Sequence, residues 1–316
     1  MKRTALALLV VIAALSIAIL WNRGARAMNI KIHAKDLPEH GLKIITPSDP
    51  SFDGKMKSLL KGQSHEAMDA LKPYAFIIEN RGEQNAVAYM VQWCFTATDG
   101  KDECYRSAYA SPASLMEGEP PIPDEMEEQS GHLKPNKARL FSLISPDGNG
   151  AFSVTISREE AEQIKAGGGI DRQAMLQRYA AELAKYTDIT VSIDGVFFDD
   201  GTFVGPDTTG FFVIMKAHVD ARRDLLNDMA LGLSQLHKSK EEVFGHVEKI
   251  ASQPDVDIGS NSTPTQFYHF HQKAYATEIL RLRKALGDDK TLAFTLQPLK
   301  KEWRKLQKKP QANETK

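Results

Sequence analysis

The sequence predicts an α+β protein: an immunoglobulin-like antiparallel β-sandwich with a helical insertion, followed by a C-terminal α-helical hairpin or bundle. Three observations predict this class. Short segments with period-two alternation and hairpin turns fill residues 73–205, and such alternation is typical of half-buried strands in antiparallel sheets. Trp93 lies in the longest alternating segment, as the central tryptophan of such a sandwich would. After Pro206 the apolar residues change to three-four spacing, which indicates helices.

The first 27 residues have the three parts of a secretory signal. Lys2 and Arg3 precede an apolar run of about 17 residues, and Ala25-Arg26-Ala27 provides a small-x-small site for cleavage after Ala27. The run is long for a signal peptide and reaches only the lower limit for spanning a bilayer. A cleaved signal peptide and a retained signal anchor therefore both stay open. In either case we expect the remaining chain to lie outside the cytoplasm, in the periplasm, secreted, or anchored by a single pass.

Composition and cysteine content exclude several classes. The net charge of -1 over 316 residues argues against a nucleic-acid binder, which needs a concentrated basic face. The first cysteine is Cys94, so no cysteine near the apolar run can accept a lipid. The basic residues between Lys300 and Lys309 are expected to form a solvated helix face. The membrane is therefore expected to be contacted only through the N-terminal segment, and only if that segment is uncleaved.

Residues 28–72 are expected to form an N-terminal segment, with an extended piece at 42–45 and a helix over about 53–71. The sandwich should begin at residue 73. Alternation and turn residues predict strands at 74–79, 86–97, 104–109, 138–144, 152–156, 189–198 and 202–204. Prolines and acidic residues break the pattern at 110–137, which predicts a long exposed loop. A capping box and helical spacing predict the helical insertion at 158–186.

Residues 206–309 are predicted to be helical, and residues 310–316 form a polar tail. One apolar stripe runs along a first long helix, over residues 212–236, at three-four spacing. The sequence allows two partners for this stripe. It can be buried against the chain's own helices, or it can bind a second copy of the protein. The two further helices predicted after it begin at capping residues Ser239 and Thr263. A last short helix is predicted over 298–308.

Cys94 and Cys104 flank one predicted hairpin, and they are the only cysteines. An odd number of residues in the hairpin loop would place them directly opposite each other and allow a disulfide. A two-residue turn at Asp99-Gly100 would instead pair Cys94 with Tyr105. We expect a structural disulfide, since the pair lacks the close spacing of redox-active cysteines.

His269 and His271 form a His-x-His pair, which chelates zinc or copper when the backbone is extended. Here the surrounding pattern is helical, and two residues apart on a helix point about 200 degrees away from each other. One packed and one solvent-facing histidine are the simpler interpretation. The two residues are kept as weak metal candidates, and with His218 as candidate members of a catalytic site.

The motifs of common enzyme classes are absent from the sequence. We find no Gly-x-Ser-x-Gly elbow, no His-Glu-x-x-His and no phosphate-binding glycine loop. The catalytic residues are therefore unknown, and no cofactor is predicted. A catalytic group assembled from distant segments stays possible, because such groups are defined by geometry and not by order in the chain.

The segment Asp194-Gly-Val-Phe-Phe-Asp-Asp-Gly-Thr-Phe-Val-Gly-Pro-Asp207 resembles a segment of uncharacterised exported bacterial proteins of the acidobacterial type. In that resemblance a strand and a tight turn lead through Gly-Pro-Asp into a long helix. The Asp200-Gly201 turn reverses the strand, Pro206 ends it, and Asp207 is expected to cap the helix. The resemblance covers roughly 15 to 40 residues and implies an architecture, not an activity.

Taken together, these features predict an exported or membrane-anchored protein that acts as a non-catalytic binding or envelope-structural module. Its partner would be another macromolecule. The alternative is an extracytoplasmic hydrolase or metal-dependent enzyme with a site at the junction of the sandwich and the helical region. A fold class does not determine function, so the choice depends on the site.

Overall fold

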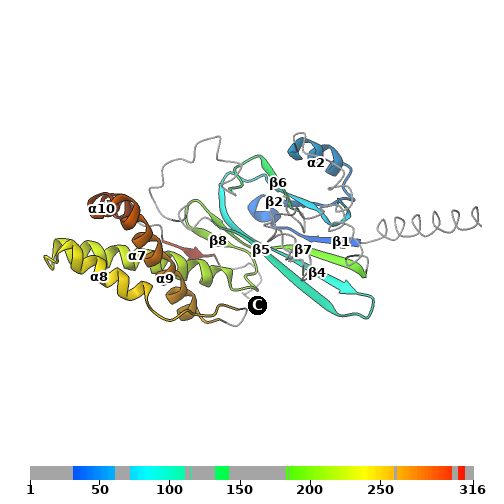
Figure 1. The fold of residues 1–316 in the computed structure, drawn as a ribbon. Helices are drawn as coiled ribbons and strands as arrows, with labels where there is room; N and C mark the ends of the chain where they lie inside the picture. Colours follow the sequence, from blue (N-terminus) through cyan, green and yellow to red (C-terminus); the bar gives the residue numbers. More distant parts are fainter. Residues whose placement is uncertain are drawn as a thin grey trace, which may run out of the picture. The chain divides into compact units, whose positions relative to one another are not determined.

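The computed structural model is that of an α+β protein (Figure 1). It describes residues 31–60, 72–110, 115, 132–141, 183, 185–259, 262–300 and 305–309. These residues divide into two compact units. Unit 1 takes the described parts of Met1–Gly82, Val91–Ser107 and Asn136–Ile193, and unit 2 those of Glu83–Met90, Ala108–Pro135 and Asp194–Lys316.

The strands form two sheets. The larger sheet has the order β5 (Asp102–Ala110), β4 (Ala86–Ala97), β7 (Tyr186–Phe198), β8 (Thr202–Val204) and β9 (Gln307–Lys308), with β1 (Lys31–Lys35) also paired with β7. The smaller sheet has the order β2 (Leu42–Ile45), β3 (Phe76–Asn80) and β6 (Lys137–Phe141). β1 is parallel to β7, and β9 is parallel to β8. The alternation predicted β2 to β8 closely, but it predicted neither parallel edge strand.

Within unit 1, aromatic side chains connect the smaller sheet to β4 of the larger sheet. Phe76 of β3 stacks on Phe141 of β6 and also lies against Trp93 of β4, with ring centroids 5.2 Å apart in each pair. A second cluster buries α2 (Phe52–Leu60) against the smaller sheet through Phe52, Met56, Leu60, Ile45, Ala75 and Ile77. The predicted helix over 53–71 is thus present to Leu60, and its remainder lies outside the described residues. Unit 1 is held by large apolar side chains between sheets and helix.

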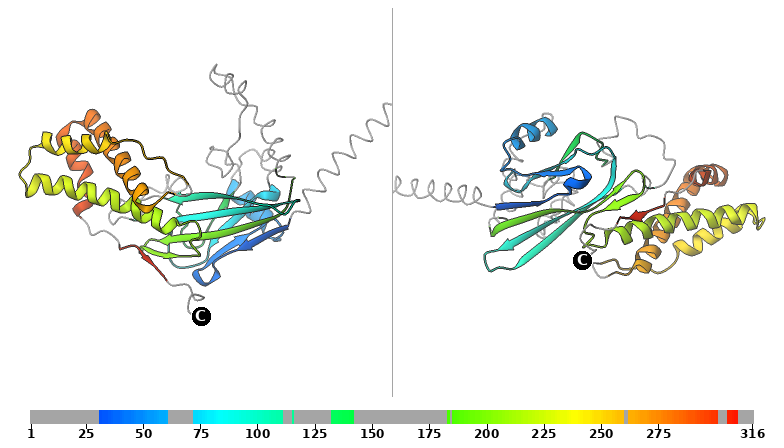
Figure 2. Two further views of the ribbon diagram at one scale, coloured as in Figure 1. Left: turned by 90° about the horizontal axis from the view of Figure 1, so that it is seen from below. Right: turned by 180° about the vertical axis from the view of Figure 1, so that it is seen from behind.

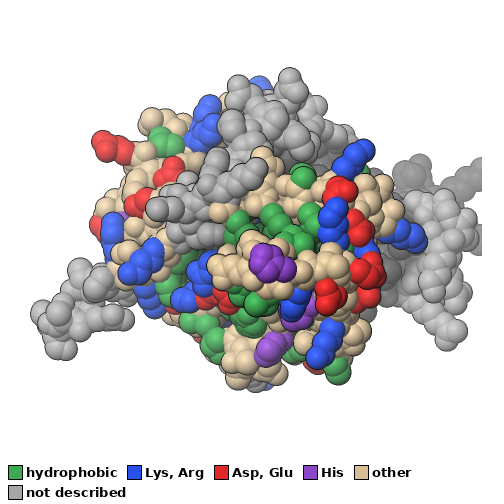
Figure 3. Space-filling view, turned by 90° about the vertical axis from the view of Figure 1, so that its left-hand side faces the viewer, with side chains coloured by type: hydrophobic (Ala, Val, Ile, Leu, Met, Phe, Trp, Pro, Cys, Tyr) green, Lys and Arg blue, Asp and Glu red, His purple; other side chains and the backbone are tan. Residues whose placement is uncertain are grey.

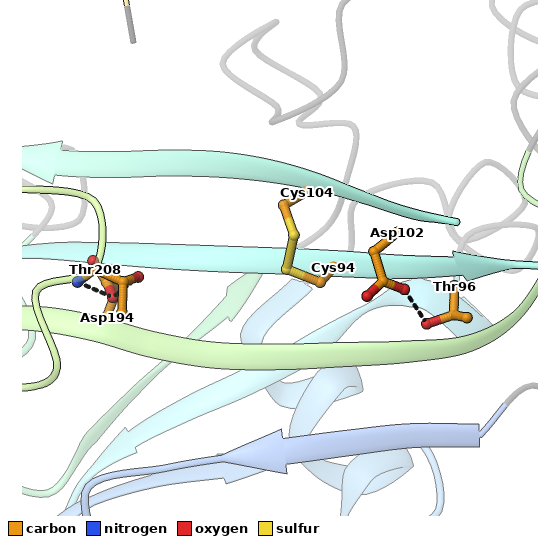
Figure 4. The surroundings of a disulfide bond; sticks show 6 residues. All are labelled: Cys94, Thr96, Asp102, Cys104, Asp194 and Thr208. Atoms are coloured by element: carbon orange, nitrogen blue, oxygen red, sulfur yellow. Dashed lines mark hydrogen bonds between the residues drawn. A yellow bond between two sulfur atoms is a disulfide. The ribbon is translucent and has the colours of Figure 1, made fainter. Parts of the chain in front are cut away.

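The hairpin between β4 and β5 carries a disulfide between Cys94 and Cys104, whose Cα atoms are 4.1 Å apart (Figure 4). The N–H of Ala97 donates to the carbonyl of Lys101, so the loop holds the odd number of residues that places the two cysteines opposite each other. The alternative pairing of Cys94 with Tyr105 through a two-residue turn is therefore wrong.

The C-terminal helices lie in unit 2. α7 (Phe211–Ser234) is followed by α8 (Lys240–Ala251), α9 (Pro264–Leu286), α10 (Asp288–Thr295) and the 3-10 turn η4 (Gln297–Lys300). α8 returns alongside α7, and α9 packs against both (Figures 1 and 2). Capping boxes at Ser239 and Thr263 start α8 and α9 as the sequence predicted.

The apolar stripe of α7 is mostly buried within unit 2. Met215 and Val219 pack in one cluster with Phe197 and Phe203 of the sheet. Further along the helix, Leu226 and Met229 pack in a second cluster with apolar residues of α8, α9 and α10. Leu236, at the end of the stripe, lies beyond α7 and is exposed. α7 therefore contacts the strands with its first half and the other helices with its second.

The predicted helix over 298–308 is wrong at its C-terminal end. Residues 297–300 form η4, whereas Gln307 and Lys308 form β9 beside β8. The N–H groups of Gln307 and Lys309 donate to the carbonyls of Gly201 and Phe203, and Leu306 packs against the phenylalanine cluster. Pairing with an open sheet edge thus overrides the helical spacing. Residues 288–295 lie in the region predicted to be helical, but no separate helix was predicted there.

Several predicted segments lie outside the described residues. These are the signal segment with Ala25 and Ala27, most of the loop 110–137, the strand 152–156, nearly all of the insertion 158–186 and the tail 310–316. None of the described helices has the length and hydropathy required to cross a membrane.

A buried carboxylate anchors the start of α7. Asp194 at the end of β7 is 2% exposed, and its Oδ1 accepts from the N–H and hydroxyl of Thr208 at 2.9 and 2.6 Å (Figure 4). Its Oδ2 accepts the same pair of bonds from Thr209 at 2.9 and 2.6 Å. Burial alone would raise the pKa of Asp194, but these four bonds outweigh it, and the pKa lies below its usual value. We call this arrangement the Asp194 clasp.

The Asp194 clasp explains the residues of the segment 194–207. Gly205 has φ +115, and a Cβ there would lie 2.7 Å from the carbonyl oxygen of Asp194, so the segment requires glycine. Asp207 precedes the helix instead of capping it directly, since α7 begins after Gly210. Its carboxylate nevertheless accepts from the N–H of Phe212 at 3.0 Å. The expected strand-turn-helix architecture is therefore present, with the helix start shifted along the chain.

Candidate functional site

Two histidines from separate helices stack on each other in unit 2. The ring centroids of His218 on α7 and His271 on α9 are 3.7 Å apart, and the rings are nearly parallel, at 10°. Tyr275 lies one helical turn after His271, and its hydroxyl is 2.7 Å from Nε2 of His218. The three side chains form one continuous array between α7 and α9.

Both stacked histidines are neutral at pH 7. Burial lowers the pKa of His218 to about 3, with further contributions from repulsion by His271 once it is protonated and by Arg222. Burial also lowers the pKa of His271 to about 4. A neutral His218 can accept the hydrogen bond of the Tyr275 hydroxyl. The array is thus a packed group of uncharged rings, which positions Tyr275.

The stacked arrangement does not form a metal site. Face-to-face imidazoles do not direct their nitrogen lone pairs to a shared point. His269 lies apart from the pair: it is exposed, and its ring contacts Tyr268 at 5.5 Å. The His-x-His candidates thus divide into one packed and one solvent-facing ring. Across the described part of the chain, no three His, Cys, Asp or Glu side chains lie close enough to hold a metal ion.

Arg222 lies beside this array without a carboxylate partner. Its guanidinium carbon is 5.2 Å from the centroid of the Tyr275 ring, within the range of a cation–π interaction. The neighbouring Arg223 instead pairs with Asp220 at 2.7 Å. None of the ion pairs among the described residues includes Arg222, although its side chain is half-buried. A half-buried arginine without an anion is unusual, since buried charges are normally paired.

A small open pocket lies next to Arg222, between α7, α9 and α10. It holds about 380 Å³ of empty space, counting the solvent at its mouth. Its lining combines polar and apolar side chains: Arg222, Leu226, Tyr275, Glu278, Ile279, Leu282, Phe294 and Thr295. Side chains at four-residue spacing supply the walls from α7 and α9, because these residues share one face of each helix.

α10 contributes an exposed aromatic ring and an unpartnered hydroxyl to this pocket. Phe294 is 63% exposed, the largest exposure among the exposed large hydrophobic side chains of the described residues. Thr295 is 8% exposed, and its hydroxyl oxygen is buried without a hydrogen-bond partner. Figure 3 views the molecule from the side on which Figure 1 shows the helices, and hydrophobic and histidine side chains gather on that face. Apolar surface and unsatisfied polar groups therefore occur together here.

The lining places opposite charges beside apolar side chains. Arg222 supplies a fixed positive charge, and Glu278 supplies a carboxylate, which forms no ion pair within the described residues. The lining includes no cysteine, serine or histidine, and the Tyr275 hydroxyl is held by His218. The pocket can therefore hold a ligand through opposite charges and an apolar wall.

The sequence located only part of this site. His218 and His271 were candidates, but Arg222, Tyr275, Phe294 and Thr295 were missed. One available signal was the spacing: Arg222 follows His218 by four residues, and Tyr275 follows His271 by four. The contribution of α10 could not be found, because no separate helix was predicted over residues 288–295 and its packing against α7 and α9 depends on the tertiary structure.

The comparisons with other proteins add no assignment to this geometry. No protein-family model, no curated protein and no solved structure matches the chain. The function is therefore argued from the site.

Proposed function

We propose that the chain is an exported or membrane-anchored, non-catalytic binding protein whose helical unit carries the binding site. The observation that carries this proposal is the pocket beside Arg222. A half-buried cation without an anion, next to an exposed phenylalanine, favours occupation by a ligand that supplies the missing contacts. The partner can be a free molecule or a group on a larger envelope component.

The location outside the cytoplasm rests on two independent features. Residues 1–27 have the composition of a secretory signal or signal anchor. The bond between Cys94 and Cys104 is compatible with an oxidising compartment, where disulfides persist. Sequencing the N-terminus of the protein from fractionated cells tests this. A start at Met28 means release, an intact Met1 in membranes means an anchor, and recovery from the cytoplasm contradicts the proposal.

We also propose that residues 73–205 form an immunoglobulin-like sandwich with a helical insertion. Two sheets joined through the buried contact of Phe76 with Trp93 support this interpretation. The parallel pairing of β1 with β7 departs from a purely antiparallel sandwich.

The alternative is an extracytoplasmic hydrolase or metal-dependent enzyme at the junction of the sandwich and the helices. The contact of Tyr275 with neutral His218 is the observation in its favour, because a neutral imidazole can act as a base. No serine, threonine or cysteine hydroxyl or thiol bonds to His218 within the described residues. We favour binding for this reason.

A fragment screen by protein NMR tests the binding function. The protein with the N-terminus that the cell produces is titrated with small charged and apolar compounds. The residues whose NMR signals shift are then located on the helices. We expect shifts at Arg222, Tyr275 and Phe294, weakened in Arg222→Gln and preserved in Arg281→Gln, which changes an exposed arginine of α9 outside the pocket. Hits that avoid the pocket, or are unaffected by Arg222→Gln, would argue against it.

Self-association through the stripe 212–236 stays a second, independent proposal. Most of the stripe is buried within unit 2, and the large apolar side chains exposed over these residues are Val213, Leu231 and Leu236. Light scattering on the released form tests it, and a strict monomer at high concentration removes it.

A further inference from the structure

We propose that the pocket between α7, α9 and α10 binds a small zwitterionic amino acid with an apolar side chain. In this arrangement Arg222 holds the carboxylate, Glu278 lies near the ammonium group, and Phe294 covers the apolar side chain. The inference rests on the proposed binding function and assigns its ligand class. Four features of the pocket support it.

Arg222 is prepared to receive a carboxylate. A guanidinium presents a planar set of donors that matches a carboxylate in bidentate geometry. Here it lies 5.2 Å from the Tyr275 ring, and the Tyr275 hydroxyl is fixed 2.7 Å from Nε2 of His218. Because His218 in turn stacks on His271, the hydrogen-bond partner of Tyr275 is itself held in place. Less rotamer freedom is then lost when a ligand binds.

Glu278 makes a simple anion a poor fit for the same pocket. It lies about one helical turn after Tyr275 on α9 and lines the pocket together with Arg222. The two side chains are not an ion pair, since their charged atoms are more than 4.0 Å apart. A ligand with only a carboxylate would face Glu278, and a ligand with only an ammonium group would face Arg222. A zwitterion matches both charges at once.

The buried hydroxyl of Thr295 is a further polar contact available to a ligand. It lines the same pocket, and no hydrogen-bond partner reaches it in the structure. Leaving such a group unpaired is costly, and a small movement of the α10 side chains toward a bound ligand would pair it. The hydroxyl can accept from an ammonium group or donate to a carboxylate.

The rest of the lining defines the side chain of the ligand. Leu226, Ile279, Leu282 and Phe294 are apolar, and Phe294 exposes most of its ring. The pocket is open to solvent, so the apolar side chain of the ligand would lie across its mouth against these residues and not inside a closed cavity. A ring stacked on Phe294 would also remove exposed apolar surface from water.

Three probes that differ by one charged group test the proposal by calorimetry on the whole protein. They are L-phenylalanine, 3-phenylpropionate, which lacks the ammonium group, and 2-phenylethylamine, which lacks the carboxylate. We expect L-phenylalanine to bind at least about tenfold more tightly than either, because each probe leaves one protein charge unmatched. Arg222→Gln should remove its advantage over 2-phenylethylamine, and Glu278→Gln its advantage over 3-phenylpropionate.

The controls separate the ligand class from the binding function. Arg281→Gln should leave all three affinities unchanged, and circular dichroism should show the native helix content in each variant. Equal affinities for L-phenylalanine and 3-phenylpropionate would overturn the zwitterion while leaving a carboxylate-binding pocket. Absence of binding by all three probes, with fragments still mapping to the pocket, would overturn the ligand class alone. Absence of both would overturn the proposed function as well.

Discussion

Within unit 2, Asp194 and Arg222 differ in how their charges are compensated by neighbouring groups. Asp194 is almost completely buried and accepts four hydrogen bonds from two threonines. Arg222 is half-buried, lies over the face of the Tyr275 ring, and forms no ion pair with the other described residues. A charge that holds the fold is normally paired, because an unpaired buried charge is costly. The difference therefore separates a structural group from a candidate binding group.

The stacked histidines differ from both groups, because they carry no charge at pH 7. Burial keeps them neutral, whereas the hydrogen bonds of the Asp194 clasp keep that carboxylate charged. The array can therefore lie between helices without a counter-ion. It positions Tyr275 at pH 7 and should fail to do so when the rings take up protons.

Replacing Asp194 should give the largest effect. Asp194→Ala leaves two backbone N–H groups and two hydroxyls at the start of α7 without their acceptor. We expect the free energy of unfolding to fall by about 3 kcal/mol, since bonds to a charged acceptor are the stronger class. Urea denaturation followed by circular dichroism measures this.

Asp257→Ala is the matched control for that experiment. Asp257 is exposed in the segment between α8 and α9 and makes no ion pair among the described residues. Its replacement should change the free energy of unfolding by less than about 0.5 kcal/mol. Equal effects of the two replacements would remove the distinction between the Asp194 clasp and an ordinary surface carboxylate.

Lowering the pH should destabilise the helical unit through His218 and His271. Their pKa values in the folded protein, about 3 and about 4, lie below the ordinary value of 6.5. The unfolded chain therefore binds protons first, so stability present above pH 6.5 is lost as the pH falls toward 4 and then 3. Between pH 7 and 5.5 we expect a loss of about 1 kcal/mol for each histidine, measured by urea denaturation.

The neighbouring histidine supplies the control for the pH experiment. His271→Gln should reduce the difference between pH 7 and 5.5, because the variant has one fewer group to protonate in the unfolded state. His269→Gln removes an exposed ring two residues away and should leave the difference unchanged. If both variants behaved alike, the assignment of the pH dependence to the stacked pair would be wrong.

The sequence predicted well the strands and helix starts that are encoded by neighbouring residues. Alternation located β4, and capping residues located the starts of α8 and α9. An odd number of residues in the hairpin loop was one of two possibilities. The hydrogen bond between Ala97 and Lys101 decides between them. These features depend on residues close in the chain, and short-range rules describe them.

The rest depends on contacts between distant residues. β9 forms because Gln307 reaches the edge of β8, about a hundred positions earlier in the chain, and no periodicity encodes that pairing. The contact of His218 with Tyr275 likewise needs the packing of α7 against α9. Arg222 looked like one more charged residue of a helix surface, since its lack of a partner is visible only in three dimensions. Sequence patterns thus found residue types, while topology defined the site.

Removing the unpartnered hydroxyl of Thr295 should give the smallest effect, and one of opposite sign. Thr295→Val keeps the shape of the side chain but deletes a buried group that has no hydrogen bond. We expect the free energy of unfolding to rise by about 1 kcal/mol, because a desolvated hydroxyl is replaced by a methyl group. Thr291→Val is the matched variant, since Thr291 has the same kind of buried hydroxyl on α10 outside the pocket. Both should stabilise the protein, but only Thr295→Val should also weaken the binding of L-phenylalanine in calorimetry. If Thr295→Val lowered stability, the hydroxyl would be bonded in solution and the pocket would resemble the Asp194 clasp, with its polar groups already satisfied.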